Sequence, residues 1–261
     1  MLYNPPGVGE EIGDSQMNTI TYDPFLVALS YLISVFGSYT ALQLAIAIPQ
    51  AKTWTGVVGS VTGAAVALGG GAIWSMHFIA MNAADMGMPV TYDAFLTVAS
   101  LVVGVVASAV GLFVVGRSDG GPLNLPLGGV ATGLGVAWMH YTGMAAMIMQ
   151  ARITYDDTLY YASIAIAVVA ATVALWLAFN LRGNWQRFGS AIVMGIAVCG
   201  MHYTGMFAVR MEHTKEAVAT TGMSLSPADL AYSVFGITAV LLTLLLIYSM
   251  WKSQRAIRAN I

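Results

Sequence analysis

The chain has 261 residues, of which 58% are hydrophobic and only 8% are charged, with a formal net charge of -2. A soluble domain carries about 25% charged residues, so this composition excludes an ordinary soluble protein. There is no basic patch and no aromatic RNA-binding pattern, so the sequence predicts no nucleic-acid partner. A single cysteine excludes an internal disulfide and a CxxC metal site. The acidic N-terminus lacks the apolar core of a signal peptide.

Seven apolar runs follow in chain order, each close to the roughly 20 residues that a helix needs to cross a bilayer. We place these spans at residues 25–48, 57–82, 94–115, 126–149, 158–180, 188–209 and 228–251. The predicted fold is therefore an all-α membrane protein with seven transmembrane helices. Residues 1–22 form an N-terminal tail, residues 23–251 the membrane domain and residues 252–261 a C-terminal tail.

The basic residues predict the orientation, because cytoplasmic loops carry an excess of lysine and arginine. With the N-terminus outside, the basic residues on the inner side are Lys52, Arg117, Arg182, Arg187, Lys252, Arg255 and Arg258. Those on the outer side are Arg152, Arg210 and Lys215. We therefore expect an extracytoplasmic N-terminal tail and a cytoplasmic C-terminal tail.

The sequence Thr-Tyr-Asp opens three odd-numbered spans, at residues 21–23, 91–93 and 154–156. Asp is a favoured helix N-cap, and Pro24 suits the first helical position. The repeat predicts three helix hairpins followed by a seventh helix, with the aspartates as caps.

Small residues recur four positions apart in the even-numbered spans, which allows helices to approach closely in lipid. These pairs are Gly59 and Gly63, Gly129 and Gly133, and Ala191 and Gly195. We therefore expect the second, fourth and sixth spans at the centre of the bundle.

A related motif lies near the end of each even-numbered span, as SMHFIAM at 75–81, WMHYTGM at 138–144 and GMHYTGM at 200–206. All copies have a methionine before the histidine and another four residues after it. Residues four apart share a helix face, so each copy directs an imidazole and a thioether the same way. An ionisable residue at this depth in a membrane is by default a candidate functional residue.

Imidazole combined with thioether selects copper among the common metals, Cu(I) in particular, whereas zinc prefers His, Cys and carboxylate. We predict that His77, His140 and His202 converge on one ion with methionines of the same face. The methionines before the histidines point about 100° away and are candidates for a second ion. The predicted metal ligands are His77, His140, His202, Met81, Met144, Met206, Met76, Met139 and Met201.

Over residues 23–251 this triplicated Met-His-Tyr-Thr pattern resembles the MHYT family of bacterial integral membrane sensor domains. The resemblance implies a location in the bacterial inner membrane. It also implies copper held near the outer face by Met76, His77, Met139, His140, Met201 and His202. The implied signal is O2, CO or NO. Phe78 and Ile79 replace Tyr-Thr in the first copy, so a shared role for those hydroxyls is not expected.

Many members of that family carry a cytoplasmic diguanylate cyclase or phosphodiesterase domain after the last helix, whereas this sequence ends ten residues after the seventh span. We expect either a stand-alone member or one without its output region. We therefore expect no enzyme activity, and a signal that passes to a cytoplasmic partner or to a self-association contact.

The function predicted is a copper-binding membrane sensor of a diatomic gas or of redox state. Three alternatives stay open. The same residues suit copper handling or delivery for a membrane oxidase. A zinc-dependent seven-helix hydrolase would use the histidines around a metal-bound water, with Asp85 as the nearby carboxylate. Haem held between two histidines is the third.

Overall fold

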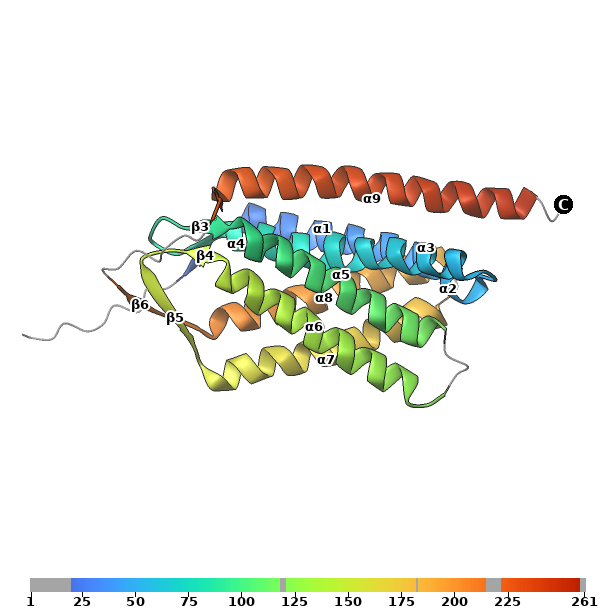
Figure 1. Cartoon of the computed structure of the whole chain (residues 1–261), viewed down its shortest axis with the longest axis horizontal. Helices are drawn as coiled ribbons and strands as arrows, with labels where there is room; N and C mark the ends of the chain where they lie inside the picture. Colours follow the sequence, from blue (N-terminus) through green and yellow to red (C-terminus); the bar gives the residue numbers. More distant parts are fainter. Residues whose placement is uncertain (1–19, 118–120, 182, 215–221, 259–261) are drawn as a thin grey trace, which may run out of the picture.

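A computed structural model describes residues 20–117, 121–181, 183–214 and 222–258, which form a bundle of long helices lying side by side (Figure 1). The helices are α1 (Pro24–Ala45), α2 (Ala47–Gln50), α3 (Trp54–Ala65), the π-helix η1 (Val66–Trp74), α4 (Ser75–Ala83), α5 (Ala94–Gly116), α6 (Asn124–Ala145), α7 (Asp157–Asn180), α8 (Asn184–Phe207) and α9 (Pro227–Arg258). The second span is one rod in which α3, η1 and α4 follow without a break. All seven predicted spans are helical, so the all-α fold is confirmed.

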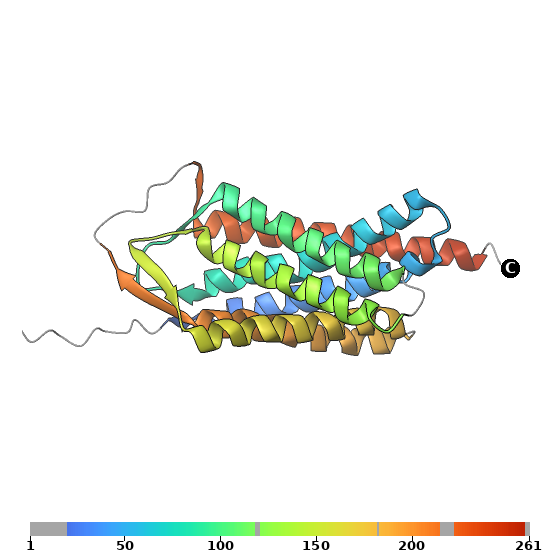
Figure 2. The same cartoon turned by 60° about the horizontal axis from the view of Figure 1, so that its bottom comes forward.

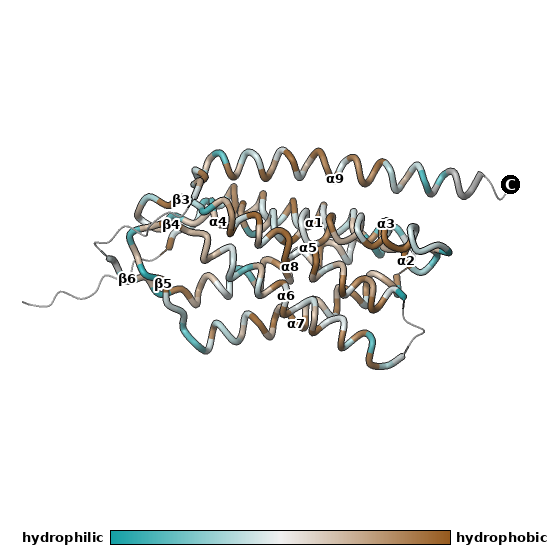
Figure 3. Tube along the Cα trace, in the orientation of Figure 1, coloured by the Kyte–Doolittle hydropathy of each residue, from teal (hydrophilic) through white to brown (hydrophobic). Residues whose placement is uncertain are grey.

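Six of these rods are long and apolar enough to cross a membrane. They cover residues 24–50, 54–83, 94–116, 157–180, 184–207 and 227–252. The predicted fourth span, α6, is long enough but less apolar, because Asn124, Pro126 and His140 lie in it together with several glycines. It packs between α5 and α7. Hydrophobic residues dominate the length of the bundle and hydrophilic residues gather at its two ends (Figure 3).

Short strands gather at one end of the bundle, which we call the strand end (Figures 1 and 2). They are β1 (Thr21–Tyr22), β2 (Ala84–Asp85), β3 (Thr91–Asp93), β4 (Met147–Ile148), β5 (Ala151–Tyr155), β6 (Val209–His213) and β7 (Ser224–Leu225). β1 pairs with β2, β3 with β4 and β5 with β6, all antiparallel, and β7 adds to β3. Each of the first three pairs joins the start of one hairpin to its end.

The strands are a correction to the sequence analysis, which extended the fourth span to residue 149 and the sixth to residue 209. The helices end at Ala145 and Phe207 instead. The main-chain N–H groups of Asp23, Asp93 and Asp156 donate to the carbonyls of Ala83, Ala146 and Ala208, at 2.8, 2.8 and 2.7 Å. Pairing at this end therefore gives partners to backbone groups that helix termini leave free.

The predicted aspartate caps are present in all three repeats. The Asp23 carboxylate accepts from the backbone N–H groups of Phe25 and Leu26. Asp93 and Asp156 accept from the residues three positions on, Leu96 and Leu159. Each Thr-Tyr-Asp segment is thus both a strand and the start of a helix.

The three hairpins close into a ring. The first helix of each hairpin also packs against the second helix of another hairpin, as α1 does on α8, α5 on η1 and α7 on α6. α9 lies along the outside of this ring, against α1 and α4 (Figure 1). The second span is the most buried rod, with 61% of its apolar window inside the protein. The first span, however, is as buried as the sixth, at 44% each, because α9 covers it. The even-numbered spans carry the converging histidines, as expected, and the first span is buried together with them.

The close-packing pairs hold in two hairpins out of three. A methyl group added at Gly133 would overlap Val168 of α7, and one at Gly195 would lie 2.7 Å from Val35 of α1. Gly59 is exposed and has open space around it. The tight contact of the first hairpin comes instead from Gly69 in η1, whose added methyl would overlap the backbone of Gly104 in α5. The close helix contact that was predicted at Gly59 and Gly63 therefore occurs in the π-helix instead, at Gly69.

The basic residues within the described part of the chain divide between the two ends as expected. Lys52 and Arg117 lie in the connections at the end opposite the strands, and Arg152 and Arg210 lie in strands. The orientation across the membrane stays a prediction. The predicted tails need adjustment, because β1 begins at Thr21 and α9 continues to Arg258. Residues 1–19 and Lys215 lie outside the described residues.

Candidate metal centre

Three histidines from three helices meet inside the strand-end half of the bundle. The Nδ1 atom of His77 on α4 lies 3.1 Å from Nδ1 of His140 on α6 and 3.1 Å from Nδ1 of His202 on α8. The ligand nitrogens of all three lie within 4.8 Å of one another. The rings are nearly perpendicular in each pair, at 80–89°, and each side chain is at most 1% exposed. The predicted convergence of the histidines is therefore present.

The spacing of this triad fits a metal ion. A bond from histidine nitrogen to a metal such as zinc is about 2.0–2.1 Å long, so two nitrogens 3.1 Å apart subtend roughly 100° at a shared ion. Without an ion the arrangement is poorly satisfied, because a neutral ring nitrogen either donates or accepts one hydrogen bond. Nδ1 of His77 faces two neighbours and can bond regularly to only one. A cation at the centre would be bound by all three.

The far nitrogens of His77 and His140 lie against the backbone of the next helix. Nε2 of all three histidines is buried and has no hydrogen-bond partner among the described residues. A methyl group at Gly143 on α6 would overlap Nε2 of His77, and one at Gly205 on α8 would overlap Nε2 of His140. Only glycine admits an imidazole edge this close to the helix backbone. The same place in the first motif is Ala80, which is fully buried.

The six methionines proposed as ligands are all buried, at 0–2% exposure. Met139 lies in the packing between helices, since a methyl group at Gly104 of α5 would be 3.2 Å from its Cγ. Met201 lines a cavity of about 40 Å³ between α6, α7, α8 and η1. These two side chains take part in helix packing, and their assignment as ligands of a second ion stays a prediction. So does ligation by Met81, Met144 and Met206.

An aromatic pair stands behind each imidazole, and sequence reasoning missed it. The rings of Phe78, Tyr141 and Tyr203 pack against their neighbouring histidines, with centroids 4.8, 4.8 and 5.0 Å apart. The tyrosines of the Thr-Tyr-Asp strands contact these rings edge to face. The pairs are Tyr92 with Phe78 at 5.8 Å, Tyr155 with Tyr141 at 5.2 Å and Tyr22 with Tyr203 at 5.5 Å. The strand repeat and the histidine repeat are thus two parts of one site.

The first motif lacks a tyrosine hydroxyl, and a tryptophan takes over its contact. In the second repeat, the Ser163 hydroxyl donates to the Tyr160 carbonyl and so accepts from the Tyr141 hydroxyl at 2.6 Å. Beside the first motif, Ser100 occupies the same place on α5 as Ser163 does on α7, and its hydroxyl accepts from Trp74 Nε1 at 3.0 Å. Phe78, which has no hydroxyl, is therefore tolerated in the first motif, because Trp74 donates the hydrogen bond to Ser100 in place of a tyrosine.

The strand tyrosines are neutral packing groups at physiological pH. Burial, with a smaller contribution from Tyr203, raises the pKa of Tyr22 to about 12. Burial, with smaller contributions from Tyr141 and Tyr160, raises the pKa of Tyr155 to about 12. Both phenols keep their protons well above neutral pH, so neither is an anionic metal ligand there.

Other candidates lie apart from the triad. Cys199, on α8, is a half-buried free thiol and does not belong to the group of converging ligand atoms. Asp85 is exposed on β2. Trp138, next to Met139, is 67% exposed on the outside of the bundle and so does not support the site. Among the histidine, cysteine and carboxylate side chains of the described residues, only the three imidazoles converge.

The sequence profile of the MHYT family, described as a bacterial signalling protein N-terminal repeat, matches residues 70–128, 133–191 and 195–259. Each matched repeat begins in or just before a helix that carries a triad histidine. The bifunctional diguanylate cyclase/cyclic di-GMP phosphodiesterase MucR of Pseudomonas aeruginosa is 39% identical over 251 residues, which are 92% of this chain and 36% of that protein.

The signaling protein YkoW of Bacillus subtilis is 32% identical over 255 residues, covering 92% of this chain and 30% of YkoW. The cyclic di-GMP phosphodiesterase NbdA of Pseudomonas aeruginosa is 35% identical over 205 residues, covering 74% of this chain and 25% of NbdA. The chain thus spans about a third or less of these relatives. No solved structure matches it. Three family repeats, apolar helices and a repeated Met-His motif place this chain in the MHYT family of bacterial signalling proteins, as a multi-pass membrane protein.

Proposed function

We propose that this chain is a membrane sensor domain that holds a copper ion at His77, His140 and His202. The observation that carries the proposal is that Nδ1 of His77 lies 3.1 Å from Nδ1 of both His140 and His202, with the ligand nitrogens of all three buried histidines within 4.8 Å of one another. A buried ionisable cluster in a membrane protein is costly and marks a functional site. A cation bound by all three imidazoles would repay that cost.

The surroundings of the triad favour copper over zinc. Thioethers, as in the buried Met81, Met144 and Met206, are ligands of soft ions such as Cu(I). A zinc hydrolase would also need a general base beside the metal-bound water, and the carboxylate named for that role, Asp85, is exposed on β2. When bound, copper would supply a redox-active centre at which O2, CO or NO can add. The imidazoles orient the ion, and the buried aromatic layer excludes water from it.

The names of the relatives indicate what the signal controls. MucR and NbdA are named for the synthesis or breakdown of cyclic di-GMP, and this chain matches only a minor part of each. We infer that the membrane domain passes its state to a cytoplasmic output domain or partner, or to a self-association contact. With the predicted orientation, α9 is the element that leads to the cytoplasm.

A polar contact links the helix that carries His77 to α9. Ser75, two residues before His77, donates its hydroxyl proton to the Gly70 carbonyl at 2.8 Å and so accepts from the Thr238 hydroxyl at 2.7 Å. Both hydroxyls are buried, and Leu242 packs beside them against Gly71. Gly70 and Gly71 belong to η1, and π-helical turns occur often at functional sites. A movement of α4 at the triad would therefore be felt by α9.

Metal analysis tests the proposed function directly. The full chain, purified without a histidine tag under oxidising conditions, should contain about one copper per chain, with EPR and optical spectra of Cu(II) bound to nitrogen. Adding CO to the reduced protein should give a copper–carbonyl infrared band. Zinc alone, or a haem Soret band, would overturn the proposal. Copper that passes readily to a chelator would identify copper handling as the function instead of sensing.

Thr238→Val tests the route to α9. The change keeps the volume but removes a buried hydrogen bond worth about 1 kcal/mol, so α9 should loosen from α4 while copper content stays unchanged. In the unaltered protein we expect copper to slow amide hydrogen exchange in residues 227–252, and in Thr238→Val this metal-dependent difference should vanish.

Thr243→Val is the matched control, because the Thr243 hydroxyl bonds only within α9, to the Ala239 carbonyl, on the exposed side. If Thr238→Val keeps the full copper-dependent difference, α9 does not receive the signal through Ser75.

A further inference from the structure

Methionines recur at fixed distances after each triad histidine, on the side of the strand end. The residue four positions on and the residue nine positions on are methionine in all three repeats. These are Met81 and Met86, Met144 and Met149, and Met206 and Met211. Those at the fourth position lie in the helices, and those at the ninth lie in or next to strands. Thioethers are therefore available at two levels between the triad and the strand end.

The first repeat forms a cavity at this level that is partly open to the surface. It has a volume of about 390 Å³ and lies between the end of α4, the connection from β2 to β3 and the start of α9. Its lining includes Met81, Met86, Met88, Asn82, Asp85 and Tyr92. Met81 is one helical turn after His77, so the cavity begins directly beside α4, the helix that carries His77.

The turn between β2 and β3 presents two of these methionines to the same space. Gly87 has a φ of 68°, a left-handed conformation that favours glycine, and its N–H donates to the Asp85 carboxylate at 2.8 Å. This turn reverses the chain between Met86, which is 4% exposed, and Met88, which is half-buried. Met86 belongs to the hydrophobic core and Met88 packs against it, so both side chains are held in place beside this space.

We propose that this cavity is a second metal site, which binds Cu(I) through the thioethers of Met81, Met86 and Met88. Thioethers select soft ions and, unlike thiols, bind without losing a proton. Asp85 is the one charged side chain among the residues that line the cavity, so its field attracts cations. Hard ions such as Ca²⁺ or Mg²⁺ require several oxygen ligands, which the lining does not supply.

The position of Met81 gives this site its relation to the triad. Met81 lines the cavity with its side chain, and it follows His77 by four residues on the same helix face. An ion bound in the cavity through Met81 would therefore contact α4, the helix that also carries His77. That relation rests on the proposed function, whereas the binding of Cu(I) at the cavity does not.

The test uses the full chain in detergent and Ag(I) as a redox-inert stand-in for Cu(I), followed by Cu(I) itself under ascorbate. Wild-type protein and His77→Ala should both retain one sulfur-ligated ion, seen in bound-metal content and in X-ray absorption. The double variant M86L/M88L should lose that ion. Leucine preserves the volume of methionine closely, and Met88→Leu alone, at the half-buried position, gives a second variant with less risk to folding.

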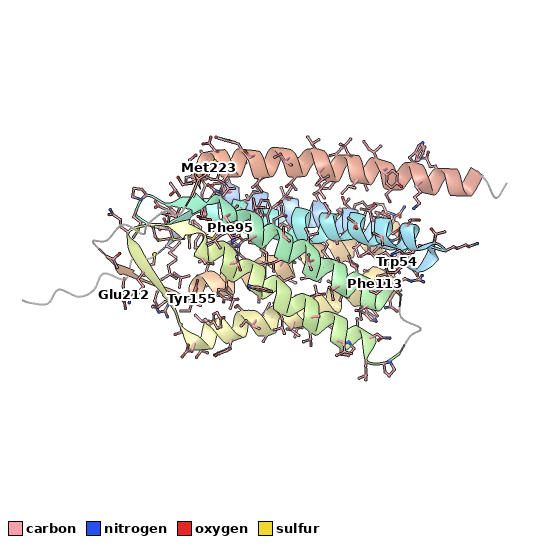
Figure 4. The ribbon with its side chains drawn as sticks, viewed as in Figure 1. Trp54, Phe95, Phe113, Tyr155, Glu212 and Met223 are labelled. Atoms are coloured by element: carbon pink, nitrogen blue, oxygen red, sulfur yellow. The ribbon has the colours of Figure 1, made fainter. Side chains whose placement is uncertain are left out.

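Met223→Leu is the control, because Met223 is 72% exposed and lies at the same end of the protein (Figure 4). It should bind metal like the wild type. The proposal is overturned if M86L/M88L keeps the sulfur-ligated ion, or if Met223→Leu loses it. Absence of any sulfur-ligated ion in wild type and His77→Ala also overturns it. Wild-type protein that binds the sulfur-ligated ion but no copper at the triad would count against the proposed function alone.

Discussion

His77→Ala is expected to abolish copper binding at the triad. Nδ1 of His77 is the atom that lies 3.1 Å from both partners, so its removal separates the remaining two ligands as well as deleting one. The loss of copper affinity should exceed the roughly 10–100-fold loss that is typical when a residue that hydrogen-bonds to a metal ligand is replaced. His140→Ala and His202→Ala should also release most of the copper, but each leaves one 3.1 Å pair intact. Competition with a Cu(I) chelator measures all three.

Trp138→Phe serves as the control for these variants, since Trp138 belongs to the same motif and is exposed on the outside of the bundle. Its copper affinity should equal that of the wild type. Full copper retention in any one of the three alanine variants would contradict a three-histidine site. Two histidines with methionine ligands would then be the better description.

Gly205→Ala is expected to damage the metal centre without touching a metal ligand. The added methyl group would overlap Nε2 of His140, and the imidazole can escape only by moving Nδ1 away from the shared point. Overpacking of this kind costs about 1–3 kcal/mol of folding free energy. Copper affinity should fall by roughly tenfold or more, as for other changes in the groups that orient metal ligands.

Gly200→Ala, five residues earlier on the same helix, is a matched control because a methyl group there meets nothing within 4 Å. It should leave the copper affinity unchanged and slightly raise the melting temperature, since alanine is the better helix former. Equal copper affinities in the two variants would show that the imidazole of His140 is not held by Gly205.

Much of this architecture could be predicted from the sequence because its signals are local and repeated. Apolar runs marked the helices, Asp23, Asp93 and Asp156 marked three helix starts, and equal spacing of the histidines indicated that they converge. The helix and cap signals depend on residues within one turn or one span, and the histidine signal on the repetition of one short motif along the chain. The same locality explains why the general fold and the triad could be predicted together.

The features that could not be predicted join parts of the chain that lie far apart. The strands are two to five residues long, and their register depends on a partner up to 133 residues away, as for Tyr92 and Leu225. Nothing local shows that Tyr92 contacts Phe78 or that His77 needs a glycine at position 143. The π-helix between α3 and α4 contains the close contact of Gly69 with Gly104, and the hydrophobic periodicity of the sequence does not indicate either feature.

The closed ring of hairpins fixes the copy number of the repeat. Open arrays such as solenoids gain or lose units readily, because each unit contacts only its neighbours along the line. Here the third hairpin closes on the first, and one imidazole from each completes the triad. A duplication or deletion would therefore change the number of metal ligands at once. α9 follows α8 in the sequence, as the first helix of a fourth hairpin would. The position beside α8 is already occupied by α1. The surplus helix is left outside the ring, where it can evolve toward new outputs without disturbing the metal centre.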